Sequence, residues 1–204
     1  MRPPGLTPAG ITEQFSTTAP ISLYGATKLS SEQLALEYGH AFGFPVWINR
    51  CSVMAGAGQF ARADQGIFAY WLHSWKENRP LKYIAFGGQG HQVRDCLHPL
   101  DLITLLQQQM ATSNGDKPAT VNLSGGMSAA MSLAQLSGWC RDRWGDREVK
   151  TDHEPRPYDL PWVVLDHALA KDTWGWQPQT TVEQILTQIA DFADTQTNWI
   201  EQSA

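Results

Sequence analysis

Two residues with complementary chemistry, Tyr24 and Lys28, stand four positions apart in the stretch YGATKLSSEQLALEYGHAFG. Helical spacing would place both side chains on one face. An ammonium group close to a phenol favours the phenolate and lowers a phenol pKa that starts near about 10. A tyrosine tuned in this way can take a proton from a sugar or alcohol hydroxyl. The alternative is an ordinary surface pair, because one such spacing among five tyrosines is expected by chance.

A glycine-rich string, GAGQFA from Gly56 to Ala61, matches G-x-G-x-x-G/A after a β-rich run and before a helical pattern. In dinucleotide-binding sites that fingerprint also needs an acidic residue about 20 positions later, at the end of the next strand. Glu77 has the distance but falls at the end of an expected helix. We therefore interpret GAGQFA as a flexible loop over a binding site rather than as a nucleotide cradle.

Two further polar residues lie where ligands are often bound. Arg94, in GGQGHQVRDCLHPLDL, follows a glycine-rich turn and could grip a diphosphate with its forked guanidinium. The alternative is a surface ion pair with Asp95. Asn122, in NLSGG, follows a β-rich run, and α/β sheets usually place ligands at the carboxyl ends of their strands. A turn-forming asparagine is equally compatible with that position.

Metal and hydrolase chemistry find no support in the sequence. The six histidines show no HxxxH or HExxH spacing, so we predict no metal site. No GxSxG string and no suggestive Cys/His pairing is present. The three cysteines include no CxxC, which is typical of a reducing cytoplasm rather than of a disulfide framework.

Helical and β-rich patterns alternate along the chain. Helices are expected over residues 23–42, 66–76, 99–110, 132–144, 166–174 and from about 180 onward. β-rich runs are VWINRCSVM, LKYIAF, ATVNLSGG and WVVL. Asp166 is expected to cap its helix, and Thr180 with Glu183 to form a capping box. The alternation predicts a single α/β domain over residues 1–204, with a thin sheet of only two or three good strands.

Apolar side chains at helical spacing indicate the core. Phe68, Trp71 and Trp75 form an aromatic stripe that we assign to the core or to a subunit interface. The final helix presents one apolar face, made by Val182, Ile185, Leu186, Ile189 and Phe192.

The amino-acid composition indicates which classes of binding partner are disfavoured. The 204 residues include 15 Lys and Arg and 20 Asp and Glu, a formal charge of −5, which does not favour nucleic acid or anionic membrane. A hydrophobic content of 42% and a charged content of 17% are typical of globular chains. No apolar run is long enough to span a bilayer, and no signal peptide is visible. We therefore expect a cytoplasmic protein.

Taken together, several segments resemble the extended short-chain dehydrogenase/reductase family, and within it the NAD-dependent sugar-nucleotide epimerases and dehydratases. They occur in the family's order as SLYGATKLSSEQ, INRCSVMAGAGQF, GGQGHQVRDCLHPLDL, ATVNLSGG and LDHALAKDTWGWQPQT. The stretch QFARADQG, beside HQVRD, is most similar to the CDP-tyvelose/CDP-paratose 2-epimerase branch.

The resemblance implies roles for particular residues near the cofactor. Tyr24 resembles the catalytic base and Lys28 its partner on the ribose of NAD. Cys51 and Ser52 occupy the strand end that faces the nicotinamide in such enzymes, so all four are expected to contact the cofactor. The tyrosine accepts a hydroxyl proton while NAD takes the hydride, which gives a keto-sugar. An epimerase then returns the hydride to the opposite face.

The same resemblance implies a site for the nucleotide-sugar. Arg94, Asn122 and Arg156 resemble ligands of its diphosphate, and Gln59 is expected to contact the substrate. No residue is expected to bind a metal.

The sequence lacks several features of the family pattern, and these differences determine what we expect of its fold and partners. The family begins with a Rossmann half that carries the glycine-rich turn, the acidic ribose ligand and most of the parallel sheet, and the catalytic Ser or Thr falls at or before Met1. We therefore expect a carboxyl-terminal portion: a partial Rossmann-type parallel sheet with a small substrate lobe. It should form a homo-oligomer or pair with a separate Rossmann-half chain. The alternatives are a nucleotide-sugar-binding module without turnover and a scaffold without a ligand.

Overall fold

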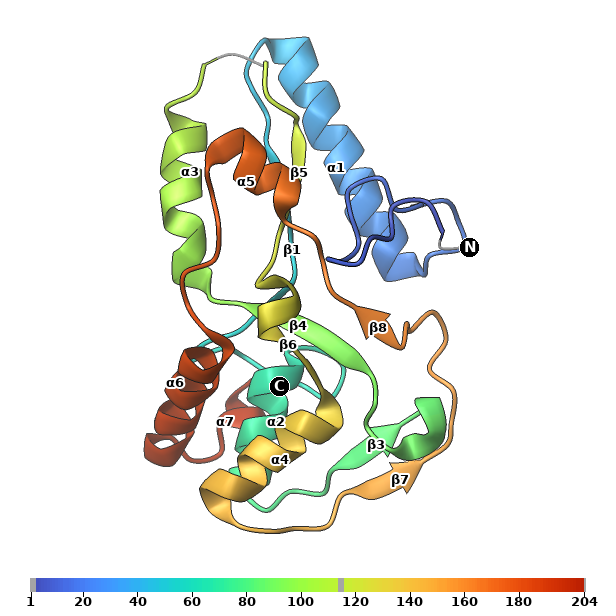
Figure 1. The fold of residues 1–204 in the computed structure, drawn as a ribbon, viewed down its shortest axis with the longest axis vertical. Coiled ribbons are helices and arrows are strands. Elements are labelled where there is room, and N and C mark those ends of the chain that lie inside the picture. The colour runs from blue at the N-terminus through green and yellow to red at the C-terminus, as the bar shows by residue number, and fades with distance from the viewer. Residues whose placement is uncertain (1–2, 114–115, 204) are drawn as a thin grey trace.

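The computed structural model describes residues 3–113 and 116–203. Figure 1 shows two lobes stacked along the long axis, with short strands where they meet. One lobe contains the long first helix and a pair of parallel strands. The other contains most of the remaining helices, and the carboxyl end of the chain lies in it.

The upper lobe of Figure 1 is built around a two-stranded parallel sheet. Its strands are β1 (Ile48–Cys51) and β5 (Thr120–Leu123), paired from Ile48 with Thr120 to Cys51 with Leu123. The helices around it are α1 (Leu23–Phe42), α3 (Ile103–Met110) and α5 (Ala168–Trp174). Leu97, Leu105, Val121, Leu123 and Trp174 are among its buried core residues.

The lower lobe is mainly helical. Its elements are α2 (Ile67–Lys76), α4 (Leu133–Trp144), α6 (Val182–Thr195), α7 (Trp199–Gln202) and the parallel pair β3 (Lys82–Ile84) and β7 (Lys150–Asp152). Phe68, Trp71 and Trp75 are buried in its core, as the aromatic stripe predicted. Ile185, Leu186 and Ile189 are buried as well, which confirms most of the expected apolar face of α6.

The lobes meet at β4 (Val93–Leu97). This strand pairs with β2 (Val53–Met54) and β8 (Trp162–Val163) in parallel and with β6 (Ala130–Ser132) in antiparallel fashion. Cys96 belongs to the core of the lower lobe, and the next residue, Leu97, to the core of the upper lobe. One strand therefore contributes to both hydrophobic cores.

The expected α/β alternation is confirmed, with differences in detail. Helix α1 has the predicted bounds, and the predicted helix from Pro99 begins as a 3₁₀ turn, Pro99–Leu102, before α3. The expectation of two or three strands was too low, because the described residues form eight. Short strands such as β4, β6 and β7 carry polar residues and too few positions to show a period of two.

Two predicted helix caps are shifted by one residue. The capping box of α6 is formed by Thr181 and Gln184, not by Thr180 and Glu183. Thr180 instead donates from its hydroxyl and its amide to the carboxylate of the buried Asp101, at 2.9 and 3.1 Å. In α5 the cap position is His167, although the Asp166 carboxylate still accepts from the amide of Ala168 at 2.9 Å.

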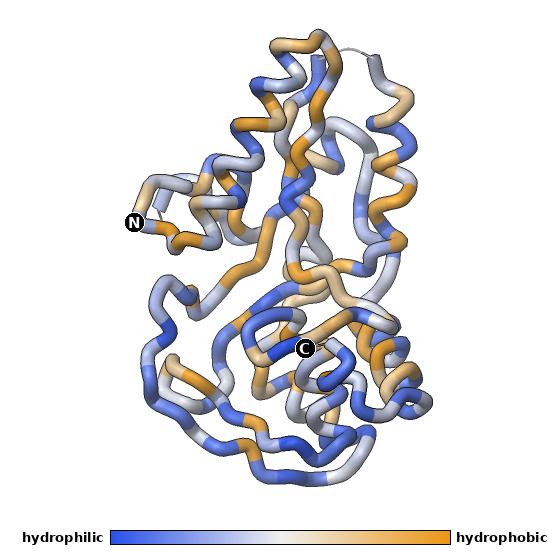
Figure 2. The backbone as a smooth tube through the Cα atoms, turned by 180° about the vertical axis from the view of Figure 1, so that it is seen from behind, coloured by the Kyte–Doolittle hydropathy of each residue, from blue (hydrophilic) through white to orange (hydrophobic). Residues whose placement is uncertain are grey.

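Helix α1 is covered on little of its surface. All of its residues are described, and among them only Gly39 is buried. A bidentate pair between Glu32 and Arg50 of β1, with contacts of 2.9 and 2.6 Å, fixes it to the sheet. Hydrophobic and hydrophilic segments alternate along the whole helix in Figure 2. Its large exposed apolar side chains are Leu23, Tyr24, Leu34, Tyr38 and Phe42. In the described part of the chain, no helix combines the length and hydropathy of a membrane span.

Ala85 carries backbone strain that a glycine would relieve. Its φ of 60° and ψ of −170° fall in a region that essentially only glycine adopts, at a cost of about 1–3 kcal/mol for other residues. We predict that Ala85→Gly raises the free energy of unfolding by about 1 kcal/mol, after the entropy of the added glycine is subtracted. Urea unfolding measures the change. The matched control, Ala134→Gly inside α4, should lower stability by about 1 kcal/mol.

His73 makes stability depend on pH. Its side chain lies 6.0 Å from the Phe192 ring and 6.2 Å from the Trp199 ring, and burial lowers its pKa to about 4, against the opposing pull of Glu77. The unfolded chain therefore binds a proton near pH 6.5 that the native protein binds only near pH 4. Stability should fall as the pH drops through this window, by up to about 3 kcal/mol.

The variant His73→Phe separates this effect from the titration of carboxylates. Its stability, measured by chemical unfolding at a series of pH values, should fall less steeply than that of the wild type between pH 6.5 and about 4. Equal slopes for the two proteins would show that His73 does not supply the effect.

Candidate functional site

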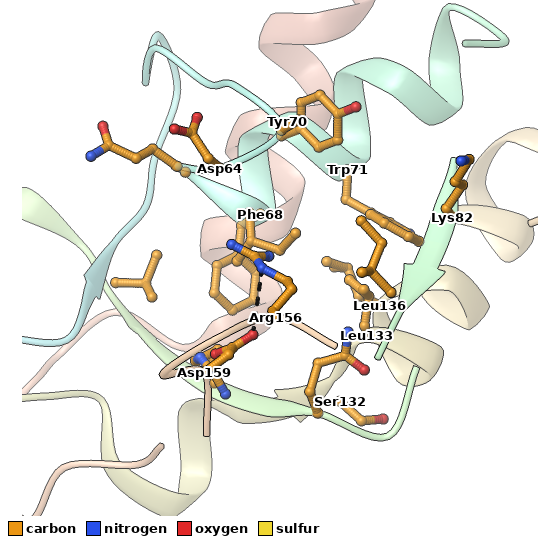
Figure 3. A pocket seen from close by; sticks show the side chains of 18 of the residues that line it. Asp64, Phe68, Tyr70, Trp71, Lys82, Ser132, Leu133, Leu136, Arg156 and Asp159 are labelled. Atoms are coloured by element: carbon orange, nitrogen blue, oxygen red, sulfur yellow. Dashed lines mark hydrogen bonds and ion pairs between the residues drawn. The ribbon is translucent and has the colours of Figure 1, made fainter. Parts of the chain in front are cut away.

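A cavity of about 500 Å³ opens in the lower lobe, between the start of α2, β3, β4 and the start of α4. One side is apolar and includes Phe68, Trp71, Ile84, Leu133 and Leu136. The lining also includes charged side chains, among them Arg94, Arg156 and Asp159, and Figure 3 shows Arg156 and Asp159 joined by a dashed line beside the apolar residues. A cavity of this size, mostly apolar with a few convergent charges, has the properties of a ligand site.

Contacts with Tyr83 and Ser137 fix the position of the apolar side of the cavity. The Trp71 ring stacks on Tyr83, with centroids 5.6 Å apart and planes 17° apart. The indole Nε1–H and the Tyr83 hydroxyl both donate to the Ser137 hydroxyl, at 2.9 and 2.7 Å. Ser137 in turn donates to the carbonyl of Leu133 at 3.0 Å. Because every polar atom of this group is satisfied, the aromatic wall keeps a fixed position against which a planar heterocycle can pack.

Two guanidinium groups face the cavity around one carboxylate. Arg94, on β4, contacts Asp159 with Nη2 to Oδ1 at 2.5 Å, and Arg156 contacts the other oxygen with Nε to Oδ2 at 3.8 Å. Burial lowers the pKa of Arg94, and Asp159 partly offsets that effect. Two cations and one anion leave a local positive charge, and Arg94 pairs with Asp159 rather than with Asp95, the alternative that the sequence left open. A forked guanidinium suits phosphate oxygens well.

Asp159 is a site residue that the sequence interpretation missed. It stands three positions after Arg156, an R-x-x-D spacing that could have drawn attention to it. Asp64 and Lys82 also line the cavity and were not selected. Asp64 belongs to the stretch QFARADQG that the resemblance singled out, but no role was assigned to it there.

The predicted proton-transfer pair lies in the other lobe. Tyr24 and Lys28 share one face of α1, with the Lys28 ammonium 5.4 Å from the centre of the Tyr24 ring, as the spacing predicted. Tyr24 is 63% exposed. Cys51 is the last residue of β1 and Ser52 follows it, so both stand at the carboxyl end of that strand. Burial raises the pKa of the Cys51 thiol.

Gln59 and Asn122 lie outside the cavity lining, in contrast to Arg94 and Arg156. Asn122 is buried, and its side-chain amide donates to the carbonyl of Ile11 at 3.0 Å while its backbone N–H donates to Glu13 at 2.6 Å. It thereby fastens the amino-terminal segment to β5. The side-chain amide of Gln59 donates to the carbonyl of Met54. Both amides thus have structural partners.

Among the described residues, no group of three or more His, Cys, Asp or Glu side chains is placed to hold a metal ion.

The comparisons with known proteins agree on one family. Residues 3–124 match the model of the NAD dependent epimerase/dehydratase family. A CDP-paratose 2-epimerase from Salmonella typhi is 28% identical over 173 residues, which cover 84% of this chain and 51% of that protein. A dTDP-glucose 4,6-dehydratase from Xanthomonas campestris pv. campestris is 28% identical over 207 residues, covering 94% of this chain and 56% of that enzyme.

The fold matches solved structures as well. The UDP-glucuronic acid 4-epimerase of Bacillus cereus, in complex with UDP-glucuronic acid and NAD, aligns with a TM-score of 0.77 at 22% identity. The alignment covers 94% of this chain and 58% of the epimerase. The chain thus spans little more than half the length of the proteins that it matches.

Proposed function

Because the chain belongs to the NAD dependent epimerase/dehydratase family, we propose that its cavity binds a nucleotide-sugar and that Tyr24 and Lys28 act on the sugar. The reaction is a transient oxidation to a keto-sugar. The observation that carries the binding half of this proposal is the placement of Arg94 and Arg156 opposite the apolar wall of one cavity.

The cavity offers a place for two parts of a nucleotide-sugar, the base and the diphosphate. The heterocyclic base packs near Phe68 and Trp71, where flat apolar surface is available. The diphosphate lies by Arg94 and Arg156, whose positive charges attract the phosphate oxygens. Relatives that act on UDP-, dTDP- and CDP-linked sugars are consistent with this arrangement.

In the proposed chemistry Tyr24 removes a proton from a sugar hydroxyl, and the ammonium of Lys28 favours the phenolate that must form. NAD, when bound, accepts the hydride. The family resemblance assigns the ribose end of NAD to Tyr24, Lys28 and the strand end at Cys51. The described residues offer no strand-to-helix glycine turn for its diphosphate, because the Gly56–Gly58 loop continues for several residues before α2 begins at Ile67.

The remainder of the cofactor site would come from further parallel strands beside β1. Among the described residues β1 pairs with β5 alone, and a parallel sheet normally has more strands and cover on both faces. The exposed apolar side chains of α1 lie next to it. We infer that a dinucleotide-binding α/β half covers this edge, and that α1 also contributes to a homo-oligomer contact.

The second candidate function is nucleotide-sugar binding without turnover. It is favoured by one observation, the absence of a dinucleotide cradle from the described residues. Affinity for a nucleotide-sugar with no NAD-dependent conversion would select it.

Arg94 provides the test of binding. Arg94→Lys keeps a positive charge opposite Asp159 but loses the fork, so we predict that the dissociation constant for UDP-glucose or CDP-glucose rises by about tenfold. Titration calorimetry measures it. The matched control is Arg143→Lys, whose partners Asp191 and Asp194 lie on α6 and which should bind as the wild type does. If the wild type binds neither compound, the proposed site is wrong.

Tyr24 provides the test of chemistry. Tyr24→Phe removes the proton acceptor while preserving the ring beneath Lys28, and we predict, with the dinucleotide-binding half present, a loss of about 10²–10⁴-fold in NAD-dependent conversion of the bound sugar. The dissociation constant of the nucleotide-sugar should change little, since Tyr24 lies outside the cavity. Unaltered turnover in the variant would exclude Tyr24 as the base.

A further inference from the structure

A short helix near the carboxyl end, α7 (Trp199–Gln202), lies against the loop that ends in one wall of the cavity. The loop runs from Gly56 to Gly66, where α2 is about to begin. Its last residues, Ala63 to Gly66, line the cavity. What holds these residues in place is therefore relevant to any ligand that the cavity binds.

Trp199 makes the most extensive contacts with the loop. Its indole Nε1–H donates to the carbonyl of Gln59 at 2.9 Å. Its ring stacks on Phe60, with centroids 5.3 Å apart and planes 10° apart. Phe60 remains 65% exposed even with this contact, so the stack supplies much of the packing that this side chain has.

Arg62 makes a second contact between the loop and the carboxyl-terminal segment. The guanidinium Nε of Arg62 donates to the carbonyl of Ser203 at 3.2 Å. Arg62 and Gln65 exchange backbone hydrogen bonds of 2.9 and 3.2 Å, which close a tight turn. Asp64 stands inside that turn and faces the cavity. Because two backbone hydrogen bonds join Arg62 to Gln65, the position of Arg62 fixes the position of the cavity-wall residues in this turn.

Helix α7 is itself anchored on the core of the lower lobe. The Trp199 ring meets Phe192 of α6 edge-on, with centroids 4.9 Å apart. Glu201 accepts from Arg79 at 2.6 Å, and the buried Ser203 donates to the carbonyl of Trp199 at 2.8 Å. The helix thus connects a fixed body, α6, to a loop that carries little packing of its own.

We propose that α7 is a strap that positions the cavity-wall turn, with Trp199 as its positioning residue. This inference rests on the proposed function, since it assigns α7 a part in nucleotide-sugar binding. Trp199 does not line the cavity and acts through Gln59, Phe60 and the turn at Arg62. Releasing the strap leaves the turn to be ordered by the ligand, and that ordering weakens binding.

The test compares Trp199→Ala and Trp199→Phe with the wild type. Trp199→Ala should raise the dissociation constant for UDP-glucose or CDP-glucose by about tenfold, mainly through faster dissociation. Trp199→Phe keeps a ring between Phe60 and Phe192 and loses the N–H bond to Gln59, so a rise of about threefold is expected. Hydrogen exchange of the backbone amides of residues 59–66 should accelerate in the same order.

Trp144→Ala is the matched control, because the Trp144 indole also donates to a residue of α6, Asp194, at 3.0 Å, while lying away from the loop. It should lose stability without a change in affinity or in exchange at residues 59–66. If Trp199→Ala binds as tightly as this control and its loop amides stay protected, the strap is refuted while the proposed function stands. If the wild type binds no nucleotide-sugar, the proposed function fails, and the amide exchange alone decides whether α7 positions the turn.

Discussion

The five residues of β4 are the constraint on which the rest of the molecule depends. Three side chains of this strand contribute to different parts of the protein: Arg94 faces the cavity, Cys96 lies in the lower core and Leu97 lies in the upper core. Three other strands bond to its backbone. A change in register at β4 would therefore move the cavity arginine and both cores together, since neighbouring strand residues point to opposite faces.

Asp95 shows how strictly that register is enforced. Its carboxyl is 1% exposed, and burial raises its pKa while the nearby Ser124 hydroxyl, 2.5 Å away, opposes the rise. Ser124 also lies 2.8 Å from the carbonyl of Leu165 and accepts from the amide of Gly126 at 2.7 Å. A buried carboxyl is costly unless such partners are present, so one alignment of β4 against its neighbours is strongly preferred. The same alignment turns Arg94 toward Asp159.

The sequence predicts the helices well and β4 poorly, for a physical reason. Helix α1 has its predicted bounds; Ser22 caps its start, and Gly43 adopts a left-handed conformation at its end. The string VRDCL has no such signal: its polar residues, Arg94 and Asp95, are paired with partners distant in sequence, Asp159 and Ser124. For the same reason Arg94 could be selected as a ligand residue, but Asp159 could not be joined to it. The partners of Asn122 in the fold, Ile11 and Glu13, lie more than a hundred positions away, so the sequence could not show them.

The two lobes differ in how much of their apolar surface is covered, and this difference bears on function. In the lower lobe Trp71 and Tyr83 both donate to Ser137 behind the cavity wall, and Trp199 donates to the carbonyl of Gln59 in the neighbouring loop. In the upper lobe β1 has one strand partner among the described residues, and α1 exposes Leu34, Tyr38 and Phe42. Pre-organised binding needs contacts like those of the lower lobe, because order already present in the free protein lowers the entropy lost on association. The proposed hydride chemistry would need a dry, enclosed site at Tyr24, which stands 63% exposed. On the proposed function, the lower lobe already has an ordered cavity for binding, whereas catalysis at Tyr24 would need a further surface to close over α1 and β1.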